Sequence, residues 1–208
     1  GAGTIYRNYF ANVNGQIGQS ADNQINCLAD LGVALGNSDN HLWEMRNGYA
    51  LASEQGLNEI DHRLQSASES ELDDLRQLLR IGIQWNTQVT MQNSQHIVSQ
   101  AYCSALPVAY SRHSSQLWAS FARLVLEAAY EATICTAILN ASATGNNQVF
   151  LTLLGGGVFG NEMEWILGAI QRALNLFRHV DLDVAIVSYG RSNQQVQQLV
   201  HQWIESNG

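Results

Sequence analysis

The sequence contains no lysine, so all ten of its basic side chains are arginines. Set against 18 Asp and Glu residues, they leave a net charge of −8. Proteins that bind nucleic acid neutralise phosphates with a basic face, so we expect no nucleic acid partner. Two explanations of the missing lysine remain open: a compositional bias of the genome, or escape from lysine-directed modification in a foreign host.

Cysteine is also scarce, and no CxxC pair occurs. Cys27, Cys103 and Cys135 stand in apolar surroundings, which is typical of small buried side chains in a reducing compartment. No Gly-x-Ser-x-Gly elbow of a serine hydrolase is present. The histidines lack the spacing of metal ligands, so we expect no metal site; they are His41, His62, His96, His113, His179 and His201.

Long apolar runs are absent too. No uninterrupted stretch approaches 18 apolar residues, so we expect no membrane span. The chain begins with Gly1 and shows no signal-peptide pattern, which predicts a processed product or a fragment that resides in the cytoplasm or is delivered into a host cytosol. A hydrophobic content of 46% is enough for a sizeable core.

The first two thirds of the chain mix helical and extended patterns. A helix is expected from Ser20 or Asp22 to about Gly36, and residues 41–52 form either a short helix or a packed loop. Further along, the expected elements are a helix with a capping box at Ser68 and Glu71, strands over residues 81–91 and 97–111, and a long helix over residues 115–140.

The last third has a regular order of elements. We expect a strand over residues 148–154, a helix over 162–177, a strand over 183–189 and a helix that begins at Ser192. This order predicts a parallel sheet with a right-handed crossover, in the α/β class. Because "VFLTLL" is almost wholly apolar, the first of these strands is expected to be covered on both faces.

Three consecutive glycines follow that strand. In parallel sheets, ligands bind beyond the carboxyl ends of the strands, where Gly155, Gly156 and Gly157 would lie. Glycine permits positive φ and close approach to backbone N–H groups, and the helix that begins near Glu162 would direct its positive end to the same place. The sequence therefore predicts a site for a phosphate or diphosphate. The alternative is that the glycines serve only tight packing of the strand against the helix.

The glycines at 155, 157 and 160 also match GxGxxG, the dinucleotide-binding fingerprint. Two features argue against that interpretation. The next strand ends Ser-Tyr-Gly-Arg and offers no acidic residue for a ribose, and only one further strand follows, whereas the fingerprint normally opens its fold.

A strand, "GGGVFGN", a helix and "DVAIVSYGR" together resemble the second half of a macrodomain, over the region from residue 115 onward. The resemblance implies a three-layer α/β/α domain over residues 1–208 with a mostly parallel sheet and a helical insertion near residues 55–80. It implies ADP-ribose or an ADP-ribosylated protein as partner, with no cofactor. The residues that it places on ADP-ribose are Gly155, Gly156, Gly157, Val158, Phe159, Gly160 and Asn161 around the diphosphate, with Phe159 against the distal ribose and Tyr189 near the adenine.

The first strands of a macrodomain and its Asn-rich loop have no clear copy here. They are expected upstream of Gly1, or residues 12–23 replace them. For hydrolysis of an ADP-ribosyl bond, the candidate is Glu131, in an apolar helix where Arg123 can pair with Glu127 but Glu131 has no charged neighbour. Its alternative is a carboxylate held by a buried partner. The expected function is hydrolysis of an ADP-ribosyl linkage, with arginine as one open target, or else recognition of ADP-ribose without catalysis.

Overall fold

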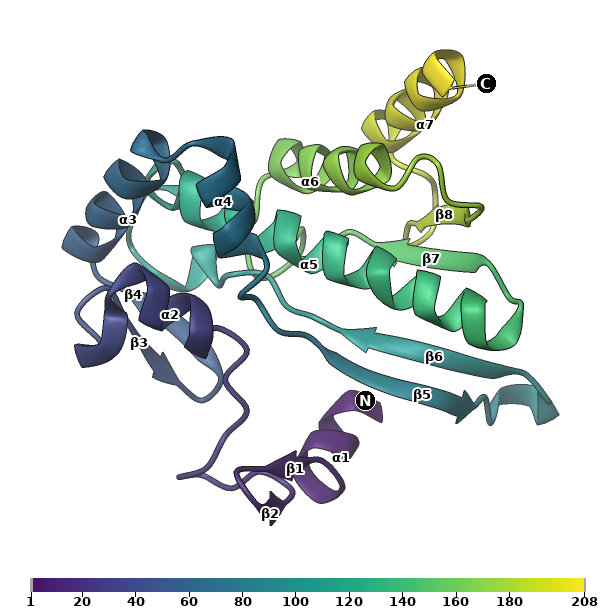
Figure 1. The fold of residues 1–208 in the computed structure, drawn as a ribbon, viewed down its shortest axis with the longest axis horizontal. Helices are drawn as coiled ribbons and strands as arrows, with labels where there is room; N and C mark the ends of the chain where they lie inside the picture. The colour runs from purple at the N-terminus through teal and green to yellow at the C-terminus, as the bar shows by residue number, and fades with distance from the viewer. Residues whose placement is uncertain (1, 208) are drawn as a thin grey trace. The chain divides into compact units, whose positions relative to one another are not determined.

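The chain forms two compact units, Gly1–Cys103 (unit 1) and Ser104–Gly208 (unit 2), in a computed structural model that describes residues 2–207. Helices and strands are mixed in both units (Figure 1), so the α/β class predicted from the sequence is confirmed at this coarse level. Among the described residues, each sheet has two strands.

Unit 1 is built from short helices and antiparallel hairpins. Its elements are α1 (Ala2–Tyr9), the β1–β2 hairpin (Asn12–Val13 and Gln16–Ile17), α2 (Ala29–Leu35), η1 (Asn37–Asp39), the β3–β4 hairpin (Trp43–Arg46 and Tyr49–Ala52), α3 (Glu54–Ser66), α4 (Glu69–Arg76), and the β5–β6 hairpin (Gly82–Gln88 and Ile97–Tyr102) with η2 (Met91–Asn93) at its tip. The capping box at the start of α4 is confirmed: the Glu71 N–H donates to Ser68 Oγ, and the Ser68 N–H donates to the Glu71 carboxylate.

Residues 41–52 form the β3–β4 hairpin, so the prediction of a short helix or packed loop was wrong. Asn47 and Gly48 both have positive φ, 50° and 80°, as the two central residues of a type I′ turn require. The predicted helix from Ser20 or Asp22 begins only at Ala29. Asparagine side chains in the preceding segment bond to backbone groups instead: Asn26 accepts the Leu28 N–H, and Asn23 donates to the Val13 carbonyl oxygen.

The core of unit 1 forms where α3 meets the segment that leads into β3. A Cβ atom at Gly56 would lie 2.2 Å from the Leu42 carbonyl oxygen, so the first turn of α3 lies directly against that backbone. Leu42, Leu57 and Ile60 are each 1% exposed. Trp43 is buried with them.

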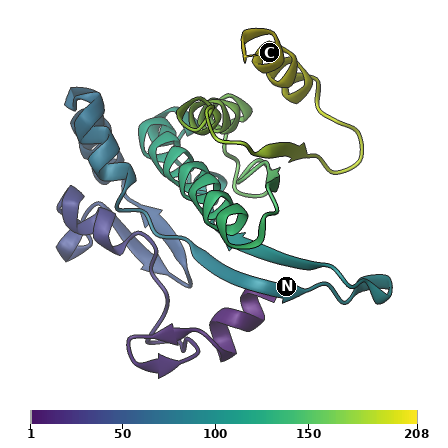
Figure 2. The same ribbon diagram turned by 45° about the vertical axis from the view of Figure 1, so that its right-hand side comes forward.

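Unit 2 carries the strand–helix–strand–helix order predicted from the sequence. Its elements are η3 (Val108–Tyr110), α5 (Ser115–Thr144), β7 (Gln148–Thr152), α6 (Met163–Leu176), β8 (Asp183–Val187) and α7 (Gln194–Asn207). β7 and β8 pair in parallel, from Gln148 opposite Asp183 to Thr152 opposite Val187. Helices α5 and α6 lie side by side in both views (Figures 1 and 2).

Within unit 2, helices cover one face of the β7–β8 pair. Val149 and Leu151 are buried, whereas Phe150, which points to the other face, is 68% exposed. The described residues of unit 2 therefore do not supply the second covering layer that the apolar pattern of β7 predicted.

Helix α5 is long and apolar enough, by length and composition, to cross a membrane, although the sequence has no unbroken apolar run of that length. In this structure, α5 packs against α6, β7 and η3. Trp118, Phe121 and Tyr130 are at most 1% exposed. These are the contacts of a core helix in a folded domain, and such helices pass the same test of length and composition.

Candidate functional site

The segment that joins β7 to α6, residues 154–161, is here called the glycine loop. It leaves β7 at its carboxyl end, beside the carboxyl end of β8, because the two strands are parallel and in register. This is the edge of a parallel sheet at which ligands usually bind. The structure thus brings the seven loop residues predicted as ligand contacts to the predicted edge.

One side of the glycine loop is fastened to residues 105–110, the segment that contains η3. The Asn161 side chain donates through Nδ2 to the Leu106 carbonyl oxygen at 2.8 Å, and the Ala109 N–H donates to the Phe159 carbonyl oxygen at 2.9 Å. The rings of Phe159 and Tyr110 meet edge to face with centroids 5.5 Å apart. Phe159 and Asn161, both predicted as ligand contacts, therefore hold the loop to the protein.

Two of the loop glycines are required by this packing. Gly155 and Gly160 have positive φ, 72° and 68°, where other residues are strained. A Cβ at Gly155 would lie 2.4 Å from the Ala105 Cβ, and a Cβ at Gly160 would lie 2.7 Å from the Ala109 Cβ. At these two positions the alternative interpretation, glycine for tight packing, is the one that the contacts support.

Gly157 is different, because the fold makes no such demand on it. Its φ lies outside the left-handed region, and a Cβ built there would meet no atom within 4 Å. Gly156 is intermediate, since a Cβ would lie 3.2 Å from the Ile166 Cδ1. Gly157 and the neighbouring Val158 are exposed, with Val158 at 77%.

The backbone N–H groups of the glycine loop also differ in whether they have an acceptor. The N–H groups of Gly156, Gly160 and Asn161 donate to backbone carbonyl oxygens, those of Leu153, Gly157 and Gly155 respectively. Within residues 2–207, no backbone or side-chain acceptor takes the N–H of Gly157 or Val158. The exposed side of the loop therefore presents two donors on a backbone that no side chain shields at position 157.

Helix α6 begins directly after the loop. Glu162 is its N-cap residue, and its side chain makes no capping hydrogen bond, so the first N–H groups of the helix are not covered by it. Glu164, in the first turn, forms an ion pair with Arg123 of α5 at 2.8 Å. The arginine offsets a carboxylate charge that would otherwise repel an anion at this helix terminus.

Two buried oxygen atoms near the same edge have no hydrogen-bond partner within the described chain: Asn161 Oδ1 and Ser188 Oγ. Asn161 is 5% exposed, and the bond from its Nδ2 to Leu106 fixes which amide atom is the acceptor. Buried polar atoms are normally satisfied, so each is a place where a hydroxyl or water donor would be stabilised. Ser188 follows the last residue of β8.

Glu131 is held in an ion pair. Its carboxylate accepts a hydrogen bond from Arg172 Nη1 of α6, so the premise that it has no charged neighbour is wrong. Arg172 comes nine residues after Met163, the first residue of α6, which corresponds to about 14 Å along a helix. The structure therefore places the Glu131 carboxylate on an arginine of α6, which is the alternative of a carboxylate held by a partner.

Tyr189 follows β8 at the same edge as the loop but has a fully exposed side chain, at 107%. Within residues 2–207, no group of three His, Cys, Asp or Glu side chains has the arrangement of a metal site. The segment that fastens the loop, residues 105–110, was not predicted as part of the site. This segment lies some fifty residues before the glycine loop in sequence, as the Asn161–Leu106 bond shows. No local sequence pattern predicts such a contact.

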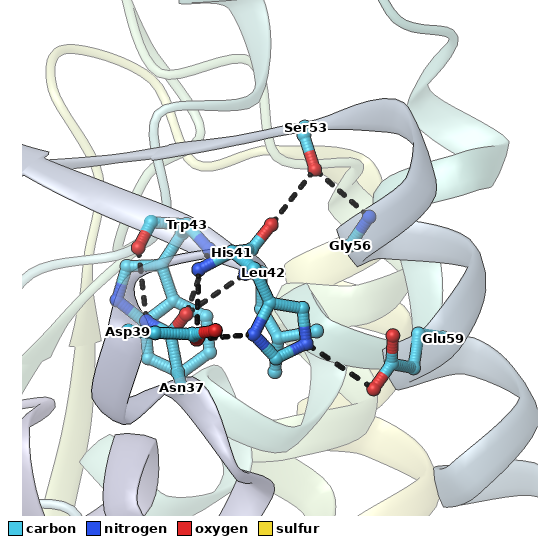
Figure 3. A network of polar contacts seen from close by, with 8 residues as sticks. All are labelled: Asn37, Asp39, His41, Leu42, Trp43, Ser53, Gly56 and Glu59. Atoms are coloured by element: carbon cyan, nitrogen blue, oxygen red, sulfur yellow. Dashed lines mark hydrogen bonds and ion pairs between the residues drawn. The ribbon is translucent and has the colours of Figure 1, made fainter.

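A second polar cluster lies in unit 1 (Figure 3) and was also missed. His41 Nδ1 lies 2.5 Å from Asp39 Oδ1, and His41 Nε2 lies 3.4 Å from Glu59 Oε1 of α3. The hydrogen bond with Asp39, followed by that with Glu59, raises the pKa of His41, and the pKa of Asp39 is lowered by the same contact with His41.

Both imidazole nitrogens of His41 thus face carboxylates. The nearby Ser53 hydroxyl donates to the His41 carbonyl oxygen and accepts the Gly56 N–H, so it does not face the ring. A nucleophile and base would need a direct contact between hydroxyl and imidazole. This cluster therefore links η1 to α3, and the glycine loop remains the candidate site.

Comparisons of the chain with protein-family models, with curated proteins and with solved structures found no match.

Proposed function

We propose that unit 2 recognises ADP-ribose, free or attached to protein, and that the exposed side of the glycine loop holds its diphosphate. The observation that carries the proposal is Gly157. It is a glycine that neither packing nor backbone conformation requires, and beside it two N–H donors lack acceptors in the described chain. A diphosphate bound there would accept hydrogen bonds from those two N–H groups. It would also lie near the first turn of α6, which has no side-chain cap.

Asn161 gives independent support. Its buried Oδ1 has no donor within the described residues, although its Nδ2 is bonded. An acceptor of this kind repels a phosphate oxygen but suits a hydroxyl or a water molecule that bridges to the ligand. A ligand that carries both diphosphate and ribose hydroxyl groups fits this pair of requirements better than inorganic phosphate does.

The proposal includes the order of elements found in the second half of a macrodomain. The parallel β7–β8 pair, the crossover helix α6 and the loop at the carboxyl ends of the strands support it. Hydrolysis is not part of the proposal, because the carboxylate of Glu131, the one candidate for catalysis, is bound to Arg172 of α6. The proposed role is thus the non-catalytic reader.

Calorimetry with ADP-ribose, using the full chain, tests the proposal. We expect binding of ADP-ribose and weaker binding of AMP, which lacks the diphosphate. Gly157→Glu should lower the affinity by about 100-fold, because a carboxylate beside the phosphates removes two charge-assisted hydrogen bonds of about 1.5 kcal/mol each.

Gly168→Glu is the matched control. Gly168 is exposed on α6 and has no atom within 4 Å of a Cβ position, so this variant adds the same charge to unit 2 outside the loop. Its affinity should remain within about threefold of the unaltered chain. If the unaltered chain binds no ADP-ribose, or if both variants bind alike, the assignment of the loop is wrong.

A further inference from the structure

The glycine loop leaves β7 at a hydroxyl group supplied by α5. The Tyr130 side chain is 1% exposed, and its hydroxyl makes two bonds at the carboxyl end of β7. It donates to the Thr152 carbonyl oxygen at 2.7 Å and accepts the Leu154 N–H at 2.9 Å. Thr152 is the last residue of β7, and Leu154 is the first residue of the loop.

These two backbone groups lie on the edge of β7 that faces away from β8. The Asp183 N–H of β8 donates to the Asn147 carbonyl oxygen, so odd-numbered residues of β7 direct their backbone groups toward β8. Backbone direction alternates along a strand, and the groups of Thr152 therefore point to the opposite edge. Tyr130 satisfies there the carbonyl and N–H groups that a neighbouring strand would otherwise pair.

The two ends of the glycine loop are held by different side chains. At its exit, Asn161 is fastened to the Leu106 carbonyl oxygen. At its entrance, Leu154 is fastened to Tyr130. The N–H groups of Gly157 and Val158 lie between these two attachments, and their directions depend on both.

We infer that Tyr130 is a positioning residue for the ligand of the glycine loop: its hydroxyl fixes Leu154, and through it the direction of the N–H groups that receive the diphosphate. The inference rests on the proposed function for its ligand, but the attachment of Leu154 is a property of the free protein. Tyr130 does not touch the ligand. It raises affinity by keeping the loop in the conformation that binds.

The test is Tyr130→Phe in the full chain, which keeps the aromatic packing and removes the hydroxyl. Two quantities are measured: hydrogen exchange of the amides of residues 154–158, and affinity for ADP-ribose by calorimetry. Exchange of the Leu154 amide should accelerate by about tenfold, the loss expected for one hydrogen bond, and affinity should fall by about tenfold.

Two control variants separate positioning from general stability. Ile170→Val shortens a fully buried side chain of α6, and Thr136→Val removes a buried hydroxyl of α5 that bonds to the Ala132 carbonyl oxygen of its own helix. Both should leave the affinity for ADP-ribose and the exchange of the Leu154 amide within about twofold of the unaltered chain, even where the whole domain is less stable.

The outcomes distinguish the two proposals. If the unaltered chain binds ADP-ribose and Tyr130→Phe binds it equally well, the positioning role is refuted and the proposed function stands. If the unaltered chain fails to bind, the proposed function fails, and the inference about affinity fails with it. Should Tyr130→Phe not fold, exchange in the unaltered chain decides: a Leu154 amide that exchanges as fast as an unprotected peptide would overturn the attachment.

Discussion

Alanine at Gly155 and alanine at Gly157 should have opposite consequences, although the two glycines are two residues apart. At Gly155, a residue with a Cβ is strained by φ of 72°, which costs about 1–2 kcal/mol. Its methyl group would also lie 2.4 Å from the Ala105 Cβ and 2.6 Å from Asn161 Nδ2, and such overpacking costs about 1–3 kcal/mol. Gly155→Ala should thus lower the free energy of unfolding by about 2–5 kcal/mol.

Gly157→Ala meets neither penalty, because no atom lies within 4 Å of the added methyl group and φ is not in the left-handed region. Its free energy of unfolding should stay within about 0.5 kcal/mol of the unaltered chain. Its affinity for ADP-ribose should nevertheless fall by about tenfold, since the methyl group occupies the side from which the diphosphate approaches.

Urea unfolding followed by circular dichroism measures both free energies of unfolding. In thermal unfolding, the Tm of Gly155→Ala should fall by roughly 10 °C or more. A second substitution checks the cause. Ala105→Gly removes the methyl group nearest the added one, so it should restore part of the stability of Gly155→Ala but none of that lost to φ strain. Equal destabilisation at positions 155 and 157 would refute the division of the glycine loop into a packed side and an exposed side.

Three further predictions concern side-chain pairs outside the glycine loop. Arg172→Leu should lower the free energy of unfolding by about 1–3 kcal/mol in a urea titration, because it leaves the half-buried Glu131 carboxylate without its cation, and Glu131→Gln in the same chain should recover part of the loss. Asn37→Ala should cost about 2–4 kcal/mol by the same measurement, since the Asn37 amide satisfies the N–H groups of Leu42 and Trp43 and the Trp43 carbonyl oxygen from inside the core, and no change in stability would contradict this. The pKa of His41 is raised in the folded chain, so its protonated form should stabilise unit 1 below about pH 6.5, and this contribution should be lost as pH rises through the folded pKa. An NMR titration should give His41 a higher pKa than an exposed imidazole has. A midpoint at or below about 6.5 would contradict the contact.

The regular last third of the chain is predictable because its signals are local. An apolar run, a glycine turn and a segment with helical spacing define β7 and α6, and a second short apolar run defines β8. Their parallel pairing follows from the short crossover and the handedness of such units. The capping box at Ser68 is equally local, since both of its partners lie within one turn.

The errors have physical causes that can be traced to particular residues. The Asn47–Gly48 turn was a local signal for a hairpin, but the helical spacing of neighbouring apolar residues competed with it. The partner of Glu131 is not predictable from helical spacing, because Arg172 lies 41 residues further along the chain. The attachment of Asn161 to Leu106 is likewise a tertiary contact. The sequence could therefore indicate a glycine loop, but not which of its glycines pack against other residues.

The uncovered side of the β7–β8 pair bears on how the protein behaves when concentrated. Phe150 and Val187 expose apolar surface on a two-stranded sheet. Exposed apolar surface of this kind promotes precipitation or reversible self-association. Charged replacements at these two positions should be tolerated, because Phe150 is 68% exposed and Val187 is 45% exposed. They offer a route to more soluble material in which the glycine loop is left untouched.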